Sequence, residues 1–414
     1  MAPTPARLER GRLAEVLRPG GLTLLSGCAA ESTLFAEELA AADDRLGAMT
    51  FCATLVAGFN RRHWLVNDDA HMLTFFMTPQ LREVRDRTTF LPLCYQDALA
   101  ELRRRKPQAA LISVAPPDAD GNCSFGVQAD FLPELWRDIP TLIAHINPAM
   151  PATRGESIPF DRFTAFYEES EPLGTVAPAA PDAMAQAIAR HVAGFVTDGS
   201  TLQLGLGKIP SAICHALSDR RHLRLHTGVI DDSLLTLADA GALADAPPSI
   251  VGLAIGSARL YERIADLPVI FRPVGITHGT EQLGAIRNLV SINSAIEVDL
   301  FGQAYAELQQ GMLMSGPGGA SDFARGVRMA GGIRIIALPA TAAQGAVSRI
   351  VGPEDAHGPV SLGRMDIDVI VTEHGAADLR GCTHDERARR LIAIADPAHR
   401  TTLNESWGNY ARRL

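Results

Sequence analysis

Short apolar runs alternate with longer amphipathic stretches along most of the chain, and this alternation constrains the fold more than any other feature. Uninterrupted apolar runs are typical of buried parallel strands. We predict such strands at residues 22–25, 49–55, 109–114, 141–146, 201–205, 223–226, 250–254, 292–293, 333–337 and 367–372. Apolar residues at helical spacing predict helices at residues 34–42, 70–84, 96–105, 183–196, 210–217 and 380–396. Strands that alternate with helices indicate open α/β sheets, mainly parallel, with helices on both faces.

A segment rich in proline, alanine and acidic residues interrupts this pattern at residues 168–184, EESEPLGTVAPAAPDAM. It has no apolar periodicity, so we interpret it as a linker or long crossover. The chain has 414 residues, which is too long for one core at roughly 150 residues per domain. We therefore predict two related α/β domains, at residues 1–175 and 176–414.

Composition excludes several classes of protein. Hydrophobic residues make up 47% and charged residues 21% of the chain, which are globular values and exclude a disordered chain or a long coiled coil. With 38 basic and 47 acidic residues the net charge is −9, so a nucleic-acid partner is not expected. No apolar stretch reaches the roughly 18 residues of a membrane helix. The N-terminus is charged where a signal peptide is apolar, and the six cysteines lack CxxC or CxxH spacing. These features predict a cytoplasmic protein with reduced thiols and no membrane partner.

The most informative local motif is TLQLGLGKIPSAI at residues 201–213. A predicted strand runs into Gly205, Leu206 and Gly207, and Pro210 suits the first turn of the following helix. Glycines at such a junction let a ligand approach the backbone, and the free N–H groups of the helix start suit an oxyanion or a phosphate. The motif lacks the third glycine of a dinucleotide site and the GK[ST] of a P-loop. The alternative is a tight strand-to-helix turn without a ligand.

A second glycine cluster, GMLMSGPGGASDF, lies at residues 311–323. Gly316, Gly318 and Gly319 precede a stretch that is compatible with a helix from Asp322, which makes a second candidate anion-binding loop. A flexible surface loop is the alternative. Two such loops in one predicted domain favour a common cleft.

Polar residues follow several predicted strands. Asn293 and Glu297 lie in SINSAIEVDLFGQ, residues 291–303, and Asp231 and Asp232 follow the strand that carries His226. Carboxylates at strand ends usually cap the next helix or are solvated, and a histidine in an apolar run is usually a hydrogen-bonded core residue. The sequence contains no metal-ligand spacing and no GxSxG motif of a serine hydrolase.

Taken together, the motifs of this chain resemble those of the acetyl-CoA hydrolase/transferase family, the class I CoA-transferases that include 4-hydroxybutyrate and butyrate:acetate CoA-transferases. The resemblance extends from about residue 20 to about residue 400. It is carried by APPDADGNCSFG (115–126), INPAMPATRGE (146–156), DGSTLQLGLGKIPSAI (198–213), LHTGVIDD (225–232), NSAIEVDLFGQ (293–303), SGPGGASDFARG (315–326) and VTEHGAADLRG (371–381).

The resemblance implies two open α/β domains with the active site in the cleft between them. It also implies a ping-pong reaction that moves CoA from an acyl thioester to a carboxylic acid through a glutamyl-CoA intermediate. It implies that CoA is a substrate rather than a bound cofactor, and that the protein is a homodimer or a higher homo-oligomer. The two glycine loops would then hold the oxyanion and the thioester. Asn293 would hold the acyl carboxylate, and Glu373 and Gly375 would line the CoA side. Family members often have a small residue after the second glycine of the first loop, where this chain has Lys208, whose ammonium group could meet a phosphate or a substrate carboxylate.

The most important departure from the family pattern lies at residue 228. Where the resemblance places the nucleophilic glutamate, in an HTE-type motif, this chain has His226, Thr227 and Gly228, and glycine cannot form an acyl anhydride. Three hypotheses follow. The protein hydrolyses or transfers the acyl group of a CoA thioester without that intermediate, with Glu297, Asp231 or Asp232 as the base. Alternatively, it is a conventional CoA-transferase with its nucleophile elsewhere, at Glu297. In the third hypothesis, it is a silent paralogue that only binds acyl-CoA.

Overall fold

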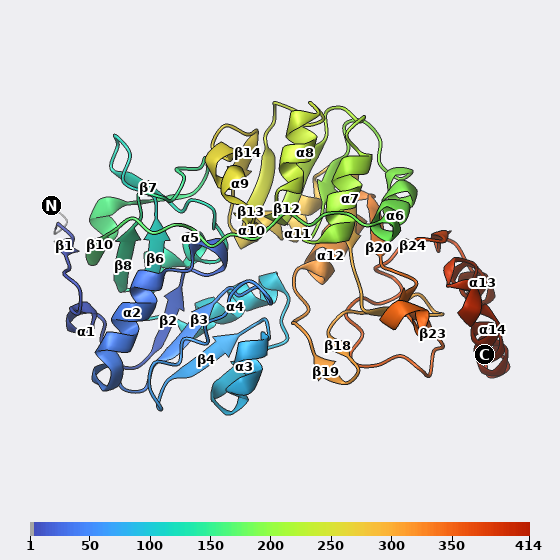
Figure 1. Ribbon diagram of the computed structural model, residues 1–414, viewed down its shortest axis with the longest axis horizontal. Helices are drawn as coiled ribbons and strands as arrows, with labels where there is room; N and C mark the ends of the chain where they lie inside the picture. The colour runs from blue at the N-terminus through green and yellow to red at the C-terminus, as the bar shows by residue number, and fades with distance from the viewer. Residues whose placement is uncertain (1–3) are drawn as a thin grey trace. The chain divides into compact units, whose positions relative to one another are not determined.

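The computed structural model describes residues 4–414 and divides into two compact units (Figure 1). The first unit comprises the chain up to Ala177 together with Ile250–Thr277. The second comprises Pro178–Ser249 and His278–Leu414. Each unit is built around its own sheet.

The sheet of the first unit has eight strands in the order β1-β10-β8-β6-β2-β3-β4-β5, and neighbouring strands run parallel. The strands are β1 (Ala6–Arg7), β2 (Leu22–Leu25), β3 (Thr50–Ala53), β4 (His71–Thr74), β5 (Thr88–Phe90), β6 (Ala109–Val114), β8 (Thr141–Ile146) and β10 (Ala165–Glu168). β6 is buried at all six residues, as expected for a strand that is covered on both faces.

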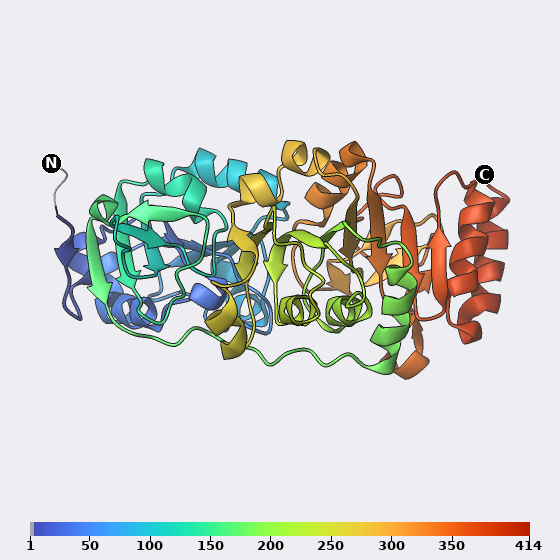
Figure 2. The same cartoon turned by 90° about the horizontal axis from the view of Figure 1, so that it is seen from above.

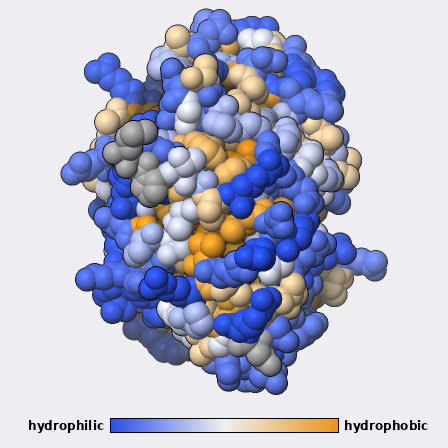
Figure 3. Space-filling view, turned by 90° about the vertical axis from the view of Figure 1, so that its left-hand side faces the viewer, coloured by the Kyte–Doolittle hydropathy of each residue, from blue (hydrophilic) through white to orange (hydrophobic). Residues whose placement is uncertain are grey.

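Helices cover both faces of this sheet. α2 (Thr33–Ala42) lies on one face, and α4 (Tyr95–Arg105) and α5 (Leu132–Leu135) lie on the other (Figure 2). Leu99 and Leu102 of α4 pack with Leu132 of α5 in one apolar cluster against the strands. The face of the molecule in Figure 3 is mostly hydrophilic, with a band of apolar side chains across its middle. Exposed apolar area is common on soluble proteins.

Residues 250–277 join the first unit by hydrogen bonding. They contain most of β13 (Ser249–Ala254), with α9 (Ala258–Arg263), β14 (Val269–Phe271) and α10 (Val274–Thr277). The Ala129 N–H donates to the Gly252 carbonyl at 2.9 Å, and the Phe271 N–H donates to the Arg154 carbonyl at 2.8 Å. Arg154 lies just before β9 (Ser157–Pro159), and β9 pairs with β7 (Asn122–Ser124).

The second unit has a parallel series of strands, β12-β11-β15-β20-β24, and β25 runs antiparallel to β24 at its end. These strands are β11 (Thr201–Gln203), β12 (Arg224–Ile230), β15 (Leu289–Asn293), β20 (Ile333–Ala337), β24 (Val369–Thr372) and β25 (Gly375–Asp378). α7 (Lys208–Ala216) and α8 (Ser233–Asp239) lie on one face, and α11 (Thr280–Gly284) and α12 (Ala320–Ala330) lie on the other (Figure 2).

Three further helices complete the second unit. They are α6 (Ala183–Ala193), which packs against α7, and α13 (His384–Ile394) and α14 (Arg400–Ala411), which pack on each other. A small sheet has the order β17-β16-β23, with β16 at Glu297–Asp299, β17 at Ala304–Tyr305 and β23 at Ile350–Val351. The helices in residues 4–414 do not combine the length and apolar character needed to cross a bilayer.

The predicted fold class is confirmed, since both units are mainly parallel sheets with helices on both faces. The predicted strands at 22–25, 109–114, 141–146 and 333–337 coincide with β2, β6, β8 and β20. Residues 169–182 contain no helix or strand, in agreement with the predicted linker. The domain boundary at residue 175 stays a prediction.

The helix predicted over residues 70–84 is wrong. His71–Thr74 forms β4, which pairs with β3 and β5, and a helix begins only at α3 (Pro79–Glu83). The apolar run at residues 71–74 forms a strand that lies between two neighbouring strands. An apolar run of this kind occurs in strands and in buried helices alike, so it does not distinguish between them. The Thr78 side chain, which accepts from the Leu81 N–H, and Pro79 mark the true helix start.

Each sheet reverses its strand order at one place. In the first unit the chain builds β3, β4 and β5 on one side of β2 and then places β6, β8 and β10 on the other. In the second unit β12 lies on one side of β11, and β15, β20 and β24 lie on the other. Connections diverge at such a point, so the carboxyl ends of the strands leave a crevice where α/β proteins bind ligands. We call these two places the switch points.

Candidate functional site

The switch point of the second unit is a cavity of about 280 Å³. It lies at the carboxyl ends of β11, β15 and β20, as the general rule for open α/β sheets predicts. Its lining residues come from α6, the β11–α7 loop and the ends of β15 and β20. They are Asp182, Met184, Ala185, Gly205, Leu206, Lys208, Ile209, Pro210, Ile292, Asn293, Ser294, Ala337 and Pro339. The sequence-predicted residues Gly205, Leu206, Lys208 and Asn293 are therefore brought together.

The first glycine loop connects β11 to α7. A side chain at Gly205 would meet no atom within 4 Å, so a ligand can approach the backbone there. Gly207 has φ +114° and ends the loop directly before Lys208, the first residue of α7, a conformation that side-chain-bearing residues rarely adopt. The first N–H groups of a helix have no partner within the helix. This loop therefore presents donors and positive potential at the edge of the cavity.

Lys208 and Asp182 form an ion pair at the rim of the cavity. The Lys208 Nζ lies 3.2 Å from the Asp182 carboxylate, and both side chains are exposed. Asp182 also caps α6 by accepting from the Ala185 N–H, and this bond, with that from Lys208, lowers the pKa of the Asp182 carboxyl. Exposed ion pairs contribute little free energy, so an anionic ligand could compete with Asp182 for the ammonium group.

A network of amide and hydroxyl groups fixes Asn293. Gln203 of β11 lies directly opposite Ser291 of β15. The Ser291 hydroxyl donates to the Gln203 Oε1 at 2.5 Å, and the Asn293 amide donates to the same oxygen at 3.0 Å. Because Gln203 and Ser291 are both buried, this network holds the Asn293 side chain at the cavity in one orientation.

Asp231 lies beside the first glycine loop. Its carboxylate accepts from the Ser233 N–H at 2.9 Å and from the Ser233 hydroxyl at 2.5 Å, at the start of α8. It also accepts from the Gly207 N–H. Burial raises the pKa of the Asp231 carboxyl despite these bonds. Asp232 directly precedes α8 and makes no side-chain cap there.

Gly228 lies near the end of β12 and packs against a histidine that the sequence analysis did not single out. A Cβ at Gly228 would lie 2.8 Å from Cε1 and 3.0 Å from Nε2 of His278. Such distances are shorter than real Cβ contacts, so the imidazole fills the space where a side chain at position 228 would begin. His278 is 50 residues from Gly228 in sequence and lies outside any motif, so no local pattern pointed to it.

The second glycine loop meets the same imidazole. Gly318 has φ +62°, and Gly319 is the residue before α12. A Cβ at Gly319 would lie 2.5 Å from Nε2 of His278. Gly228 and Gly319, which the sequence analysis placed in separate motifs, are thus the two glycines against which His278 packs. Gly316, earlier in this loop, is buried.

Ten predicted residues are not among those that line the cavity: Gly207, Gly228, Asp231, Asp232, Gly316, Gly318 and Gly319, which are described above, and Glu297, Glu373 and Gly375. The Glu297 carboxylate in β16 accepts from the His357 N–H at 2.5 Å. The Glu373 carboxylate accepts from the Ala340 N–H at 2.8 Å, next to the cavity residue Pro339. Gly375 begins β25 and pairs with Thr372. The roles given to these residues by resemblance stay predictions.

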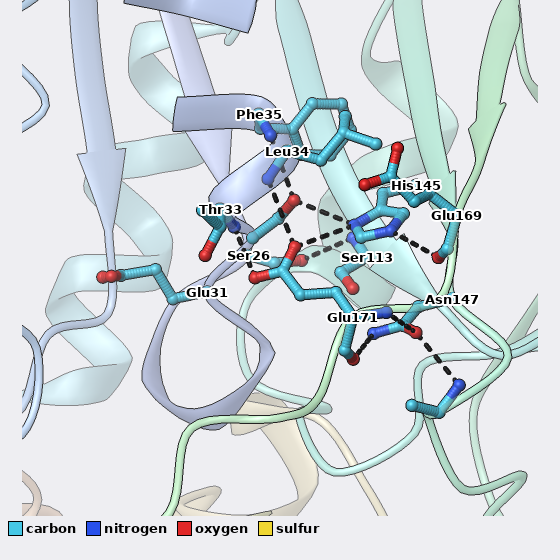
Figure 4. Close-up of polar contacts among 12 residues, drawn as sticks. Ser26, Glu31, Thr33, Leu34, Phe35, Ser113, His145, Asn147, Glu169 and Glu171 are labelled. Carbon is cyan, nitrogen blue, oxygen red and sulfur yellow. Dashed lines mark hydrogen bonds and ion pairs between the residues drawn. The ribbon is translucent and has the colours of Figure 1, made fainter. Parts of the chain in front are cut away.

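The switch point of the first unit is occupied by the chain's own side chains (Figure 4). The Glu171 carboxylate accepts from the Thr33 N–H at 2.7 Å and from the Leu34 N–H at 3.2 Å, at the start of α2. The Ser32 hydroxyl lies 2.8 Å from Nδ1 of His145. Asn147 holds the backbone of Glu171 on both sides, through bonds of 2.7 and 3.0 Å.

The polar groups next to this cluster are also paired. The Gly27 N–H donates to the Gln128 side chain at 2.9 Å, and Gln128 donates to Asp130 at 2.7 Å. Both side chains are buried. A fully satisfied buried network of this kind rigidifies a fold and offers few groups to a ligand. Over residues 4–414 no three His, Cys, Asp or Glu side chains gather in a way that could hold a metal ion.

Comparison with known proteins gives consistent matches. Residues 256–407 match the model of the acetyl-CoA hydrolase/transferase C-terminal domain. The chain is 35% identical to the 4-hydroxybutyrate coenzyme A transferase of Clostridium kluyveri over 329 residues, which cover 77% of this chain and 76% of that protein. The crystal structure of RipA from Yersinia pestis has a TM-score of 0.89 at 29% identity, covering 98% of both chains. That of a 4-hydroxybutyrate CoA-transferase from Porphyromonas gingivalis has a TM-score of 0.81 at 30% identity, covering 99% of this chain and 98% of that one.

Proposed function

The chain belongs to the acetyl-CoA hydrolase/transferase family, and we propose that it cleaves a CoA thioester at the cavity of the second unit without a glutamyl-CoA intermediate. The acyl group passes to water or to another acceptor, so the reaction is a hydrolysis or an acyl transfer. The CoA thioester is a substrate and not a permanently bound cofactor.

The packing of Gly228 against His278 carries this proposal. The family resemblance expects a glutamate at position 228, where this chain has no side chain. The His278 imidazole occupies the adjoining space, with Cε1 2.8 Å from where a Cβ would lie. The missing carboxylate at residue 228 and the volume that His278 occupies there both support a mechanism without a covalent intermediate at this residue.

Asp231 is the residue best suited to act as the base. Its raised pKa brings the carboxyl closer to neutral pH, where general bases work best. In the proposed hydrolysis, water attacks the thioester carbonyl carbon while Asp231 accepts a proton from it. The C–S bond then breaks, CoA leaves as the thiol after taking up a proton, and the products are the carboxylic acid and CoA.

The cavity supplies the binding groups for this reaction. The N–H groups at the start of α7 suit the developing oxyanion or a phosphate of CoA. Lys208 adds a positive charge at the rim, and Asn293 adds an amide that is held by Gln203 and Ser291. These groups are in place before a ligand arrives, which is the condition for effective electrostatic stabilisation.

The deciding assay measures CoA release from acetyl-, butyryl- and succinyl-CoA by chromatography, with and without a carboxylic acid acceptor. The proposal predicts CoA release in the absence of any acid. Exchange of CoA that requires the acid contradicts it and supports conventional transfer. Tight binding of acyl-CoA without turnover contradicts both and supports a silent binding protein.

Replacement of the proposed base sharpens this assay. Asp231→Asn is expected to lower kcat about 100-fold or more, the usual effect of losing a general base. Asp219→Asn is the matched control, because Asp219 is an exposed residue of the same unit that pairs only with its neighbour Arg220 in the bonds we observe. If the two variants have equal kcat, Asp231 is not the general base.

A conventional CoA-transferase is the second candidate, favoured by the name of the relative from Clostridium kluyveri. Glu297 is then the nucleophile, although its carboxylate is held by the His357 N–H. Incubation with acyl-CoA followed by hydroxylamine or borohydride, then peptide mass spectrometry, separates the candidates. A label on Glu297 supports transfer. A complete absence of labelled carboxylates supports the first proposal.

Placing a glutamate at residue 228 tests whether His278 prevents a covalent intermediate at this position. Gly228→Glu alone is expected to give no transferase activity, because its Cβ collides with His278. Gly228→Glu combined with His278→Gly removes the collision and is expected to give acceptor-dependent transfer if the rest of the cleft is retained. Transfer by the single variant would show that His278 does not block the position.

The family resemblance also leads us to propose a homodimer or a higher homo-oligomer. Light scattering after size-exclusion chromatography measures this directly. The acyl group, the acceptor and the cytoplasmic location stay predictions.

A further inference from the structure

Apolar side chains form most of the wall of the cavity in the second unit. Eight of the thirteen lining residues carry such side chains. Ala185, Ile292 and Ala337 are each at most 2% exposed, and Leu206 and Ile209 are partly exposed. An apolar ligand group that fills this cavity removes apolar surface from water on both sides of the contact, which is favourable. The walls therefore suit a hydrocarbon group.

The polar lining groups suit one carbonyl group and no second charge. Among the described residues that line the cavity, Lys208 is the one cation, and its Nζ lies 3.2 Å from the Asp182 carboxylate at the rim. The Asn293 amide and the backbone at Gly205 suit the thioester carbonyl. A second carboxylate, as in a succinyl group, would lie against the apolar walls or beside Asp182, and either position costs free energy.

The volume of the cavity sets the size of that group. The cavity has about 280 Å³, and an apolar protein cavity of about 150 Å³ holds one benzene molecule. By this comparison the cavity has room for about eleven non-hydrogen atoms. The carbon, oxygen and sulfur of the thioester take three of these places. An acetyl group would fill only one more with its methyl carbon and would leave most of the apolar wall in water.

Met184 makes part of the wall adjustable. It is the second residue of α6, it lines the cavity, and it is 37% exposed. The next residue, Ala185, is buried and also lines the cavity. A methionine side chain is unbranched and flexible, so it adapts to ligands of different shape. Met184 thus lies between the cavity and solvent, where a side chain limits the length of a bound chain.

We propose that this cavity takes the acyl group of the thioester, and that the preferred substrates are CoA thioesters of uncharged, apolar carboxylic acids with about six to eight carbon atoms. Met184 is a specificity-determining residue that limits the length of the acyl chain. This inference rests on the proposed function and names its substrate class. The chemical step is the one given for the proposed hydrolysis.

The chain-length profile of the wild type is the first test. kcat/KM is measured for acetyl-, butyryl-, hexanoyl-, octanoyl-, dodecanoyl- and succinyl-CoA. We expect a rise of about fourfold for each added methylene group up to octanoyl-CoA and no further rise for dodecanoyl-CoA. Succinyl-CoA should lie at least about tenfold below butyryl-CoA, which has the same number of carbon atoms and no charge. Equal values for acetyl- and octanoyl-CoA, or the highest value for succinyl-CoA, would overturn the inference.

Substitutions of Met184 test its role as the length limit. Met184→Ala removes three non-hydrogen atoms from the wall, so the optimum should move to acyl chains about two to three carbon atoms longer. Met184→Trp should lower kcat/KM for octanoyl-CoA about tenfold or more and leave acetyl-CoA within about threefold. Met329→Ala is the matched control, because Met329 is an exposed methionine in α12 that does not line the cavity. A purely structural effect of Met184 would change all substrates alike and would overturn its assignment.

A binding measurement separates this inference from the proposed hydrolysis. CoA and its S-ethyl, S-hexyl and S-octyl thioethers, which have no carbonyl group to attack, are titrated into the wild type by calorimetry. We expect Kd to fall about fourfold per methylene group and the heat capacity change to become more negative with chain length. This pattern without CoA release from any thioester supports the inference and contradicts the hydrolysis. CoA release from thioesters, with a Kd that is independent of chain length, overturns the inference and leaves the proposed function in place.

Discussion

The two units differ in what lies at the switch point of their sheets. Each sheet reverses its strand order once, and such a reversal is where open α/β sheets generally form a crevice at the carboxyl ends of their strands. In the first unit, Glu171, His145 and neighbouring polar side chains fill this place and satisfy one another. In the second unit, Gly205 and the start of α7 border an open cavity of about 280 Å³.

The difference shows how one architecture can be structural in one copy and receptive in the other. A helix start needs acceptors for its N–H groups. The Glu171 carboxylate supplies them for α2, with N–H to oxygen distances of 2.7 and 3.2 Å. At α7, Asp231 accepts from Gly207, and the adjoining cavity leaves room for a ligand to supply further acceptors. Fold alone therefore does not locate the function, and the proposed function rests on the second switch point because its cavity is not filled by the chain's own side chains.

The largest expected effect comes from filling the open switch point. Gly205→Val adds an isopropyl group to a cavity wall where a Cβ meets nothing within 4 Å, at a backbone conformation open to any residue. We expect CoA release to fall about 100-fold or more because the thioester is displaced, with little change in melting temperature. Gly408→Ala is the control, since its Cβ also meets nothing within 4 Å and it lies in α14, away from the lining residues. Unchanged turnover in Gly205→Val would place the reaction elsewhere.

Removing a side chain from the switch point of the first unit is expected to lower the free energy of unfolding rather than the turnover. Glu171→Ala removes two charge-assisted hydrogen bonds to α2, so the free energy of unfolding should fall by about 2 kcal/mol, with turnover retained. Glu169→Ala is the matched control, because its carboxylate pairs with Arg10 at the surface, and such pairs contribute about 0–1 kcal/mol. Urea unfolding and CoA release are measured on both. If Glu171→Ala loses most of its turnover while its free energy of unfolding is unchanged, the polar cluster of the first unit takes part in function.

Two of the buried histidines, His145 in the first unit and His278 in the second, are expected to make the stability depend on acid. Burial lowers the pKa of His145 below its usual 6.5 despite bonding to Glu169 and the nearby charge of Glu171, and it lowers the pKa of His278 to about 3. Below pH 6.5 these histidines bind protons in the unfolded chain but stay neutral in the folded protein. The free energy of unfolding therefore falls as the pH drops.

Each ring therefore contributes a slope of up to about 1.4 kcal/mol per pH unit. For His278 this slope extends from pH 6.5 down to about 3. His145→Gln and His278→Gln should each flatten the curve of unfolding free energy against pH below 6.5. Urea titrations between pH 4 and pH 8 measure it, and slopes equal to that of the wild type would show that both rings are protonated in the folded protein.

The smallest effect is expected at the rim of the open cavity. Lys208→Gln removes an exposed ion pair with Asp182 and should change the unfolding free energy by less than about 1 kcal/mol. If the ammonium group meets an anionic part of the thioester, KM rises severalfold and kcat stays the same. The effect on KM should shrink at high salt. A KM equal to that of the wild type at low salt would leave Lys208 without a binding role.

Much of the fold was predictable because continuous apolar runs mark strands that are buried on both faces. β6 at Ala109–Val114 and β20 at Ile333–Ala337 are examples. The wrong helix at 70–84 arose because the same apolar density suits a strand that is covered by neighbours, and the helix-start signal at Thr78 and Pro79 was missed. Edge strands such as β5 (Thr88–Phe90) were missed because they are short and partly exposed.

The site was predictable in part for a related reason. Gly205, Lys208 and Asn293 follow strands that are neighbours in the sheet, so local motifs sufficed to name them. His278 was not predictable, because its role depends on contact with Gly228 and Gly319, which are 50 and 41 positions away in the chain. Only the packed structure shows that these positions share one imidazole.

Hydrogen exchange of backbone amides tests the central comparison most directly. Exchange is measured with and without a non-hydrolysable CoA thioester analogue. We predict that amides at 33–35 exchange slowly in both states, because Glu171 and Ser32 accept from them. Amides at 205–209 should slow markedly when the analogue is added. Binding of the analogue without slower exchange at 205–209 would contradict the account.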